Sequence, residues 1–362
     1  MKEKIICELF SYANSPHLQQ LYTGFGILHK KGAIQLIERI CKEDLIDKTK
    51  PPHLWDVKRA YLKVIINRDL TIYYDVHDSF EINTEALKDV DFYFKRSYSD
   101  EQIYKLNNKE KIFPLGLNYL IYSTCLDIFL IKRFILDKGV EKLKTLARGI
   151  AIDHLIGGAK TYVPRVSRLE FYPDFNIPPK ILFMVKAWDH NEAKSKDKSE
   201  ERDFMNKIRA QCIRLLKKEF GVHFLGGFAY SVYSNDRFRD CLLPDDKLSQ
   251  KKNYMALLRE FPICIATTGL HGSIGWKLAE YVSYSKAIVT ERLNYRVPGH
   301  FEKELNYLDF VSPEDCVEST VRLFHNYSLR CQLMINNYRY YHSYLRPDSL
   351  VLNTLAIAMG SI

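Results

Sequence analysis

The feature that most constrains the fold is an alternation of short apolar runs with longer amphipathic stretches, which is clearest after residue 180. The apolar runs that we expect to be buried strands are Lys180–Trp188, Val222–Leu225, Pro262–Thr267, Ala287–Thr290 and Tyr307–Val311. The stretches with helical spacing of apolar residues are Glu200–Phe220, Leu248–Glu260 and Ser273–Ser283. Strands and helices that alternate in this way predict a parallel sheet with helices on both faces.

Two helix ends in this half carry typical signals. Gly221 follows the first helix, at the place where a C-cap glycine is common. Ser312 comes directly before Pro313 and two acidic residues, an order typical of an N-cap followed by the first helical turn. We therefore expect another helix to begin at Pro313.

The first half shows the same alternation less regularly. We expect strands at Ile5–Phe10, Leu70–Val76, Val90–Phe94 and Ile112–Phe113, and a helix at Ala33–Cys41. Prolines then gather between residues 160 and 180, and the helical tail is broken at Pro347. The predicted organisation is a domain of residues 1–160, a linker of 161–180, a domain of 181–321 and a helical segment of 322–362.

Composition narrows the classes of function. A chain of 362 residues fits two domains, and a net charge of +9 suits anionic partners such as phosphorylated small molecules, anionic lipid or nucleic acid. We expect no nucleic-acid partner, because the basic residues form no tail and no nucleic-acid-binding motif is present. The eight cysteines are scattered without metal-ligand spacing, and the N-terminus resembles no signal peptide, so we expect a cytoplasmic protein.

The segment Thr267–Glu280 carries the clearest functional signal. It leaves a predicted strand, crosses Gly269, His271, Gly272 and Ser273, and enters a helix that contains Lys277 and Glu280. Glycines let a backbone approach a phosphate closely, and helix N-termini attract anions. The segment contains neither a Walker A loop nor the GxGxxG pattern. It could equally be a plain strand-to-helix turn, with Glu280 a surface acid.

The run Gly275–Val282, followed by Lys286–Glu291, resembles the donor-site block of GT-B glycosyltransferases of the group 1 type. This resemblance implies two Rossmann-like domains that face a central cleft, with a C-terminal helix that crosses back to the N-terminal domain. It also implies that Glu280 holds the donor ribose and that the glycine-rich turn takes the diphosphate. Basic residues near the first strand of that domain would contact the diphosphate, which indicates Lys186 and, more weakly, Arg202.

Two segments of the first half also resemble this family. Tyr73–Asp78 resembles a strand that ends in a His-Asp pair facing the cleft, and Phe113–Asn118 resembles the turn that closes the N-terminal domain. We therefore expect His77 and Asp78 to be catalytic, with His77 as a base or sugar contact that Asp78 could orient. The structural alternative is that Asp78 caps the next segment. Gly24 and Gly26 would line the acceptor side.

The sequence departs from the family at one position. Many retaining members have a second acid eight positions before the ribose-binding one, and here that position is Gly272. The contact to the donor sugar and the stereochemical outcome therefore stay unassigned. His271, the neighbouring residue, could replace that acid as a hydrogen-bond donor or could have only a structural role.

We expect no metal and no cofactor besides the nucleotide sugar. The DxD motif that anchors a metal in the other main glycosyltransferase fold has no counterpart at a strand end. Asp89 and Asp91 do form an Asp-Val-Asp run, but it lies at the start of a predicted strand, where ligands rarely bind. Lysines and helix N-termini would then neutralise the diphosphate.

The segment Leu117–Ala147 combines large apolar residues with several lysines and arginines. It could be an interfacial helix that docks on an anionic membrane, where a lipid-linked acceptor would wait. It could also be a core helix with one basic, solvated side. The first interpretation predicts a peripheral location at the inner face of the cytoplasmic membrane.

These observations lead to one main hypothesis and its rivals. The chain would be a glycosyltransferase that moves a sugar from a nucleotide-diphosphate sugar to a glycan or lipid-linked acceptor, in bacterial surface polysaccharide synthesis as in many members of the family. The alternatives are a nucleotide-sugar epimerase on the same fold, a pyridoxal-phosphate phosphorylase, for which no segment marks a Schiff-base lysine, and a catalytically silent partner in a polysaccharide-assembly complex.

Overall fold

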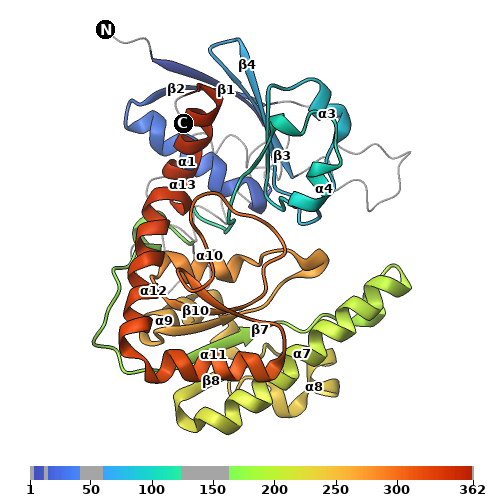
Figure 1. Ribbon diagram of the computed structural model, residues 1–362, viewed down its shortest axis with the longest axis vertical. Coiled ribbons are helices and arrows are strands. Elements are labelled where there is room, and N and C mark those ends of the chain that lie inside the picture. The colour runs from blue at the N-terminus through green and yellow to red at the C-terminus, as the bar shows by residue number, and fades with distance from the viewer. Residues whose placement is uncertain (1–3, 12–14, 41–59, 124–162, 361–362) are drawn as a thin grey trace, which may run out of the picture. The chain divides into compact units, whose positions relative to one another are not determined.

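The computed structural model describes residues 4–11, 15–40, 60–123 and 163–360 and separates into two compact α/β units (Figure 1). Unit 1 consists of Met1–Glu170, Tyr295–Gly299 and His342–Ile362, and unit 2 consists of Phe171–Asn294 and His300–Tyr341. The predicted fold class, α/β with two Rossmann-like parts, is confirmed. The change from unit 1 to unit 2 falls inside the segment that the prolines marked as a linker.

Unit 2 is built on a five-stranded, fully parallel sheet in the order β11-β10-β9-β7-β8. Its strands are β7 (Ile181–Val185), β8 (Phe224–Phe228), β9 (Ile263–Ala266), β10 (Ala287–Glu291) and β11 (Tyr307–Phe310). Every strand predicted in this half is present. Contiguous apolar runs identified them because strands covered on both faces need apolar residues at successive positions.

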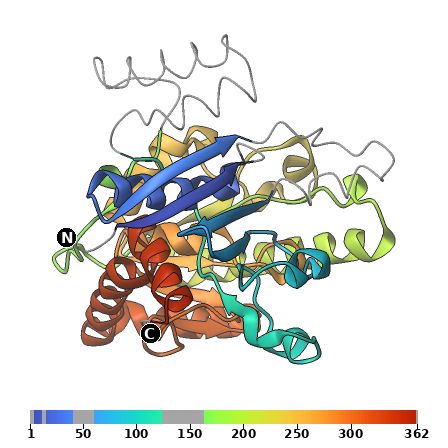
Figure 2. The ribbon, with the colours of Figure 1, turned by 90° about the horizontal axis from the view of Figure 1, so that it is seen from above.

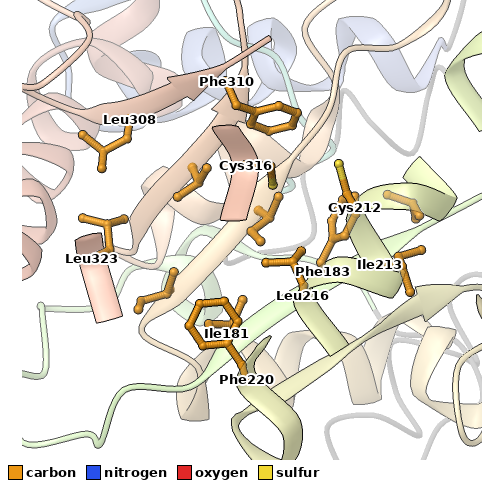
Figure 3. Close-up of a cluster of buried hydrophobic side chains, with 14 of the residues drawn as sticks. Ile181, Phe183, Cys212, Ile213, Leu216, Phe220, Leu308, Phe310, Cys316 and Leu323 are labelled. Carbon is orange, nitrogen blue, oxygen red and sulfur yellow. The ribbon is translucent and has the colours of Figure 1, made fainter. Parts of the chain in front are cut away.

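Helices cover both faces of this sheet. On one face α7 (Lys196–Phe220) and α11 (Pro313–His325) pack on β7 and β11, and their apolar side chains form the core of unit 2 (Figure 3). On the other face lies α10 (Trp276–Ser283), whose Tyr281 hydroxyl donates to the carbonyl of Ile265 in β9. The remaining helices of unit 2 are α8 (Val232–Arg237), α9 (Lys251–Glu260) and α12 (Tyr327–Tyr340).

The predicted helix ends are largely confirmed. Gly221 ends α7 at φ +49°, in the left-handed region that glycine adopts easily. Ser312 caps α11 in a capping box with Asp315, and Pro313 is the first helical residue. Ser273, in contrast, does not begin α10, because the chain stays extended until Gly275.

Unit 1 contains a six-stranded mixed sheet in the order β2-β1-β3-β4-β5-β6. Its strands are β1 (Ile5–Ser11), β2 (Ile34–Ile40), β3 (Tyr61–Ile66), β4 (Leu70–Asp75), β5 (Phe92–Lys95) and β6 (Ile112–Pro114). The first two lie side by side and parallel, as the blue arrows in Figure 2 show. β3 runs antiparallel to both of its neighbours. This reversed strand distinguishes the sheet from the fully parallel one of unit 2.

Two assignments in unit 1 need correction. The predicted helix Ala33–Cys41 is β2 as far as Ile40, and buried Ile34 and Leu36 flank exposed Gln35 in the alternation of a strand. β3 was not predicted at all. It forms a hairpin with β4 through Asn67 and Arg68, whose φ values of +51° and +62° suit the tight turn of a two-stranded ribbon.

The glycine-bearing segment Tyr22–Gly26 lies inside α1 (Gln19–Lys30). This helix packs against α13 (Pro347–Ala358), the last helix of the chain, in unit 1 (Figure 1). The predicted return of the C-terminal helix to the N-terminal domain is therefore confirmed. On the opposite face of the sheet, α3 (Thr84–Lys88) and α4 (Asp100–Tyr104) contribute apolar side chains to a smaller cluster.

The tail does not return as one piece. α12 stays in unit 2, because Leu333 and Met334 are buried in its core, and only the chain from His342 onward belongs to unit 1. The predicted segment 322–362 therefore has to be divided near Tyr341. Residues 124–147 of the basic, apolar segment, which could be an interfacial helix or a core helix, lie outside the described residues. Within the described ranges, no helix is long and apolar enough to cross a bilayer.

Candidate functional site

The polar residues of unit 2 gather where β7, β9 and β10 end. Because these strands are parallel, their carboxyl ends share one edge of the sheet, which is where ligands bind in open α/β sheets. Lys186 follows β7, Thr267 follows β9, and Glu291 is the last residue of β10. Most of the sequence-predicted donor-site residues lie at this edge, which we call the unit 2 edge.

Arg209 of α7 ties two of these strand ends together, and the sequence analysis did not identify it. Its Nη1 donates to the carbonyl of Lys186 at 2.9 Å, its Nε to Oγ1 of Thr267 at 3.0 Å, and its Nη2 to the carbonyl of Thr268 at 2.8 Å. The side chain is buried, but no pattern in the sequence marked it, because α7 is rich in charged residues that face solvent.

The third strand end is joined through Glu291. Its Oε2 accepts hydrogen bonds from both the backbone N–H (2.9 Å) and the hydroxyl (2.7 Å) of Thr268. The start of the loop after β9 is therefore held from β10 on one side and from α7 on the other. The loop leaves the sheet in one defined direction.

Steric contacts explain why glycine occupies two positions of this loop. Gly269 donates its N–H to the carbonyl of Ser273 at 2.7 Å, and a Cβ there would lie 2.7 Å from the Ser273 hydroxyl. Gly272 has a φ of +63°, and a Cβ would lie 2.5 Å from Nδ2 of Asn294. His271 also adopts a left-handed conformation (φ +61°), and its N–H donates to Glu201 of α7 at 2.6 Å. The loop is thus a tight, anchored turn.

Lys186 and Arg202 lie on the same aromatic ring. The Nζ of Lys186 is 5.5 Å from the centre of the Trp188 ring, and the guanidinium carbon of Arg202 is 5.9 Å from it. Asn206 of α7 fixes Trp188, because its amide bonds both the N–H (3.0 Å) and the carbonyl (2.7 Å) of that residue. Arg202 donates to the carbonyl of Asp189 at 2.6 Å. Two predicted diphosphate contacts therefore lie close together beside the loop.

Lys277 and Glu280 contact side chains of α9 rather than Trp188. Glu280 is only 2% exposed and forms an ion pair with Lys251, so the alternative of a surface acid is wrong. The Nζ of Lys277 lies 3.9 Å from the centre of the Tyr254 ring. Burial lowers the pKa of Lys277 to about 8, although the Glu280 carboxylate acts in the opposite direction. Lys251 and Tyr254 are further members of this group that sequence reasoning missed.

A second polar cluster lies in unit 1, where β4 and β5 end. Asp75 and Lys95 are register partners on these parallel strands, and Nζ of Lys95 lies 2.9 Å from Oδ2 of Asp75. The Tyr93 hydroxyl donates to the same oxygen. Burial alone would raise the pKa of Asp75, but Lys95, His77 and Tyr93 together lower it to about 2. The carboxylate is therefore ionised at neutral pH despite its burial.

His77 is held by this carboxylate. Its ring Nδ1 lies 2.8 Å from Oδ1 of Asp75, and its backbone N–H donates to the same oxygen at 3.0 Å. An ionised carboxylate only accepts hydrogen bonds, so Nδ1 carries a proton, and in the neutral form of the ring Nε2 is the acceptor. The orienting acid is thus Asp75, and the predicted role of Asp78 in orienting His77 is wrong.

Asp78 has a different partner. It forms an ion pair with Arg96, whose side chain is 4% exposed. A nitrogen of Arg96 also lies 3.5 Å from Nδ1 of His17, and burial together with the Arg96 charge lowers the pKa of His17. The Ser97 hydroxyl contacts the carbonyls of His77 (3.1 Å) and Asp78 (2.8 Å). The turn that carries both predicted catalytic residues is therefore firmly held.

The acceptor-side assignment of Gly24 needs correction, and that of Gly26 stays a prediction. Both are helical residues of α1. A Cβ on Gly24 would clash with the carbonyl oxygen of Pro347 and lie 2.6 Å from Cγ2 of Val351, both in α13. Gly24 thus allows two helices to approach closely, and α13 occupies the space beside it.

The described residues show no group of three or more His, Cys, Asp or Glu side chains that could hold a metal ion. Asp91, from the Asp-Val-Asp run, accepts the N–H of Thr71 at 2.8 Å and so joins β4 to the start of β5. Asp89 ends α3. Both residues lie at the end of the sheet opposite Asp75.

No protein-family model and no curated protein matches the chain. Among solved structures it is similar to the C-terminal domain of LpcC from Francisella tularensis, a group 1 family glycosyl transferase, with 12% identity, 49% of this chain and 97% of that one covered, and a TM-score of 0.33. It is similar to TarM of S. aureus, in complex with UDP, with 12% identity and a TM-score of 0.36. The match covers 83% of this chain and 64% of TarM.

It is also similar to the UDP-GlcNAc 2-epimerase of Neisseria meningitidis, with 13% identity and a TM-score of 0.36. The match covers 75% of this chain and 62% of the epimerase. The chain thus spans less than two thirds of the length of TarM and of this epimerase. These similar structures include a glycosyl transferase and an epimerase.

Proposed function

We propose that the chain is a glycosyltransferase in which unit 2 binds a nucleotide-diphosphate sugar and unit 1 supplies the base for the acceptor. The observation that carries the proposal is the gathering of Lys186, Arg202 and the loop of residues 267–275 at the unit 2 edge. Cations beside a glycine loop that leads into the N-terminus of α10 suit a diphosphate, because the first N–H groups of a helix attract anions.

The same residues would stabilise the leaving group. When the bond between the sugar and the diphosphate breaks, negative charge grows on the released nucleoside diphosphate. Lys186 and Arg202 would offset that charge without having to move, which is the arrangement that accelerates such a step. We expect the reaction to need no metal, and activity in excess EDTA tests this expectation.

Glu280 is the proposed ribose contact. Its Oε1 is occupied by Lys251, and Oε2 is the oxygen that we assign to a ribose hydroxyl. Lys251 is the counter-ion of this buried side chain, and a charged acceptor strengthens the bond to a hydroxyl. His271 and Gly272 stand where many retaining members have an acid, so we assign no sugar-binding carboxylate in this loop.

His77 is the proposed base. Asp75 fixes the proton on Nδ1, so Nε2 takes the proton of the acceptor hydroxyl as its oxygen attacks the anomeric carbon. The imidazolium that forms is stabilised by the Asp75 carboxylate, in the way that a buried acid supports a catalytic histidine. We propose a glycan or lipid-linked acceptor and, for the basic segment 117–147, contact with an anionic membrane.

An assay for products separates this proposal from its rivals. The protein is incubated with a set of nucleotide sugars, with and without oligosaccharide and lipid-linked acceptors, and both the nucleotide and the sugar products are analysed. A transferase releases the nucleoside diphosphate and forms a glycosidic bond only when an acceptor is present. Release of the nucleoside diphosphate and an altered sugar without any acceptor would instead identify a hydrolysing epimerase. A silent partner would release neither.

A further inference from the structure

Arg209 carries a positive charge into the interior without a direct counter-ion. Its side chain is 6% exposed, and its three hydrogen bonds go to two backbone carbonyls and a hydroxyl. Within the part of the chain that the structure describes, no carboxylate lies within ion-pair distance of its guanidinium. Arg96 of unit 1, which is about equally buried, is in contrast paired with Asp78.

This arrangement is costly for a residue that serves only to connect loops. A buried charge without a partner loses its hydration, and neutral acceptors replace only part of it. Burial accordingly lowers the pKa of Arg209 to about 10, and the more distant Glu291 carboxylate opposes this shift only in part. A neutral side chain could hold the same carbonyls at a smaller cost in free energy, so the positive charge itself needs a functional explanation.

The position of Arg209 suggests that function. The carbonyls that it holds belong to Lys186 and Thr268, which begin the two segments that we propose to contact the diphosphate. The guanidinium is hydrogen-bonded to these segments and is buried, so water screens its charge little. A diphosphate bound in front of them would therefore interact with it strongly.

We propose that Arg209 is a positioning residue for the donor diphosphate, which fixes the strand-end loops at the unit 2 edge and whose buried charge is balanced when the diphosphate binds. This inference rests on the proposed function of unit 2. It adds that part of the affinity for the diphosphate comes from a side chain that does not touch it. The interaction must therefore grow with the number of phosphate charges on the ligand.

Calorimetric titration of purified full-length protein with two ligand series tests this inference. The series are uridine, UMP and UDP, and guanosine, GMP and GDP. Arg209→Gln removes the charge, and Arg209→Lys keeps it but cannot hold both loops. Arg214→Lys is the matched control, because Arg214 lies on the same helix, is half exposed and pairs with Asp240 at 2.6 Å.

For the series that the wild type binds, we expect Arg209→Gln to weaken the diphosphate at least tenfold, the monophosphate less, and the nucleoside less than twofold. Arg209→Lys should weaken the diphosphate three- to tenfold and leave the nucleoside unchanged, which keeps the test valid if the glutamine variant does not fold. Equal weakening of all three ligands, or no weakening, would overturn the inference while the donor site stands. If the wild type binds neither of these diphosphates nor TDP, the proposed function itself fails.

Discussion

At the scale of single residues, two buried carboxylates have charged partners. Asp75 has three polar partners in unit 1, and Glu280 is paired with Lys251 in unit 2. Breaking such a group leaves a buried charge without compensation, which is costly, so each of these carboxylates should be sensitive to substitution. Their effects should differ, because one supports a proposed base and the other a proposed ligand contact.

Replacing Asp75 with Asn should lower kcat for sugar transfer by about 10²- to 10⁴-fold, because the amide no longer fixes the proton on Nδ1 of His77 or stabilises the imidazolium. The KM for the nucleotide sugar should change little. Steady-state kinetics measure both. Asp91→Asn is the control, since Asp91 joins the same two strands at their other end. Equal loss of activity in both variants would show that Asp75 has only a structural role.

Asp75 should also make stability depend on pH. Its pKa of about 2 in the folded protein lies below the ordinary value of 3.8, so its stabilising effect is present above pH 4 and is lost as the pH falls toward 2. The shift corresponds to about 2 kcal/mol. Urea unfolding between pH 3 and 5 should show a weaker pH dependence in Asp75→Asn than in the wild type. Parallel curves would contradict the cause assigned to the shift.

At the scale of elements, the close contact of α1 and α13 depends on Gly24. Alanine there should destabilise the protein by about 2 kcal/mol or more, because the added methyl group meets the backbone of Pro347, which cannot rotate away. Chemical unfolding of Gly24→Ala measures the loss. Val351→Ala should not rescue it, since the first clash is with a backbone oxygen. A variant as stable as the wild type would show that the helices can separate without cost.

How well an element could be predicted depended on the strength of its local pattern. The strands β7 to β11 were predictable because each is an apolar run bounded by polar residues. β2 was misassigned since the apolar positions of Ile34–Ile40 fit both a helix and a strand. β3 has one clear alternation, with Lys63 between Leu62 and Val64, but no preceding signal marked its start.

Whether a residue of the candidate site could be predicted also depended on its local sequence pattern. His77 and the glycine loop were predictable because they follow strands, where polar residues and glycines stand out. Arg209 and Lys251 were not, since both are basic residues on helices with many charges, and only the folded structure shows which of them turn inward. The role of Asp75 was hidden because its contact with His77 depends on the turn after β4.

At the scale of the whole molecule, each unit has one polar cluster at the carboxyl edge of its own sheet. The unit 2 edge offers cations and a glycine loop, and the cluster of unit 1 offers a histidine held by a carboxylate. A net charge of +9 agrees with anionic substrates for the whole chain. A transferase needs both kinds of group, one for the leaving diphosphate and one for the acceptor proton.

The central claim, that unit 2 binds a nucleoside diphosphate, is tested most directly by titrating the protein with UDP, GDP, TDP and CMP, with and without EDTA. Calorimetry and thermal shift should show saturable binding of one diphosphate that EDTA does not change. Glu280→Ala should abolish it, while the control Arg214→Lys should retain it. If no diphosphate binds at millimolar concentration, or if Glu280→Ala binds as the wild type does, the donor site that we assign to unit 2 is wrong.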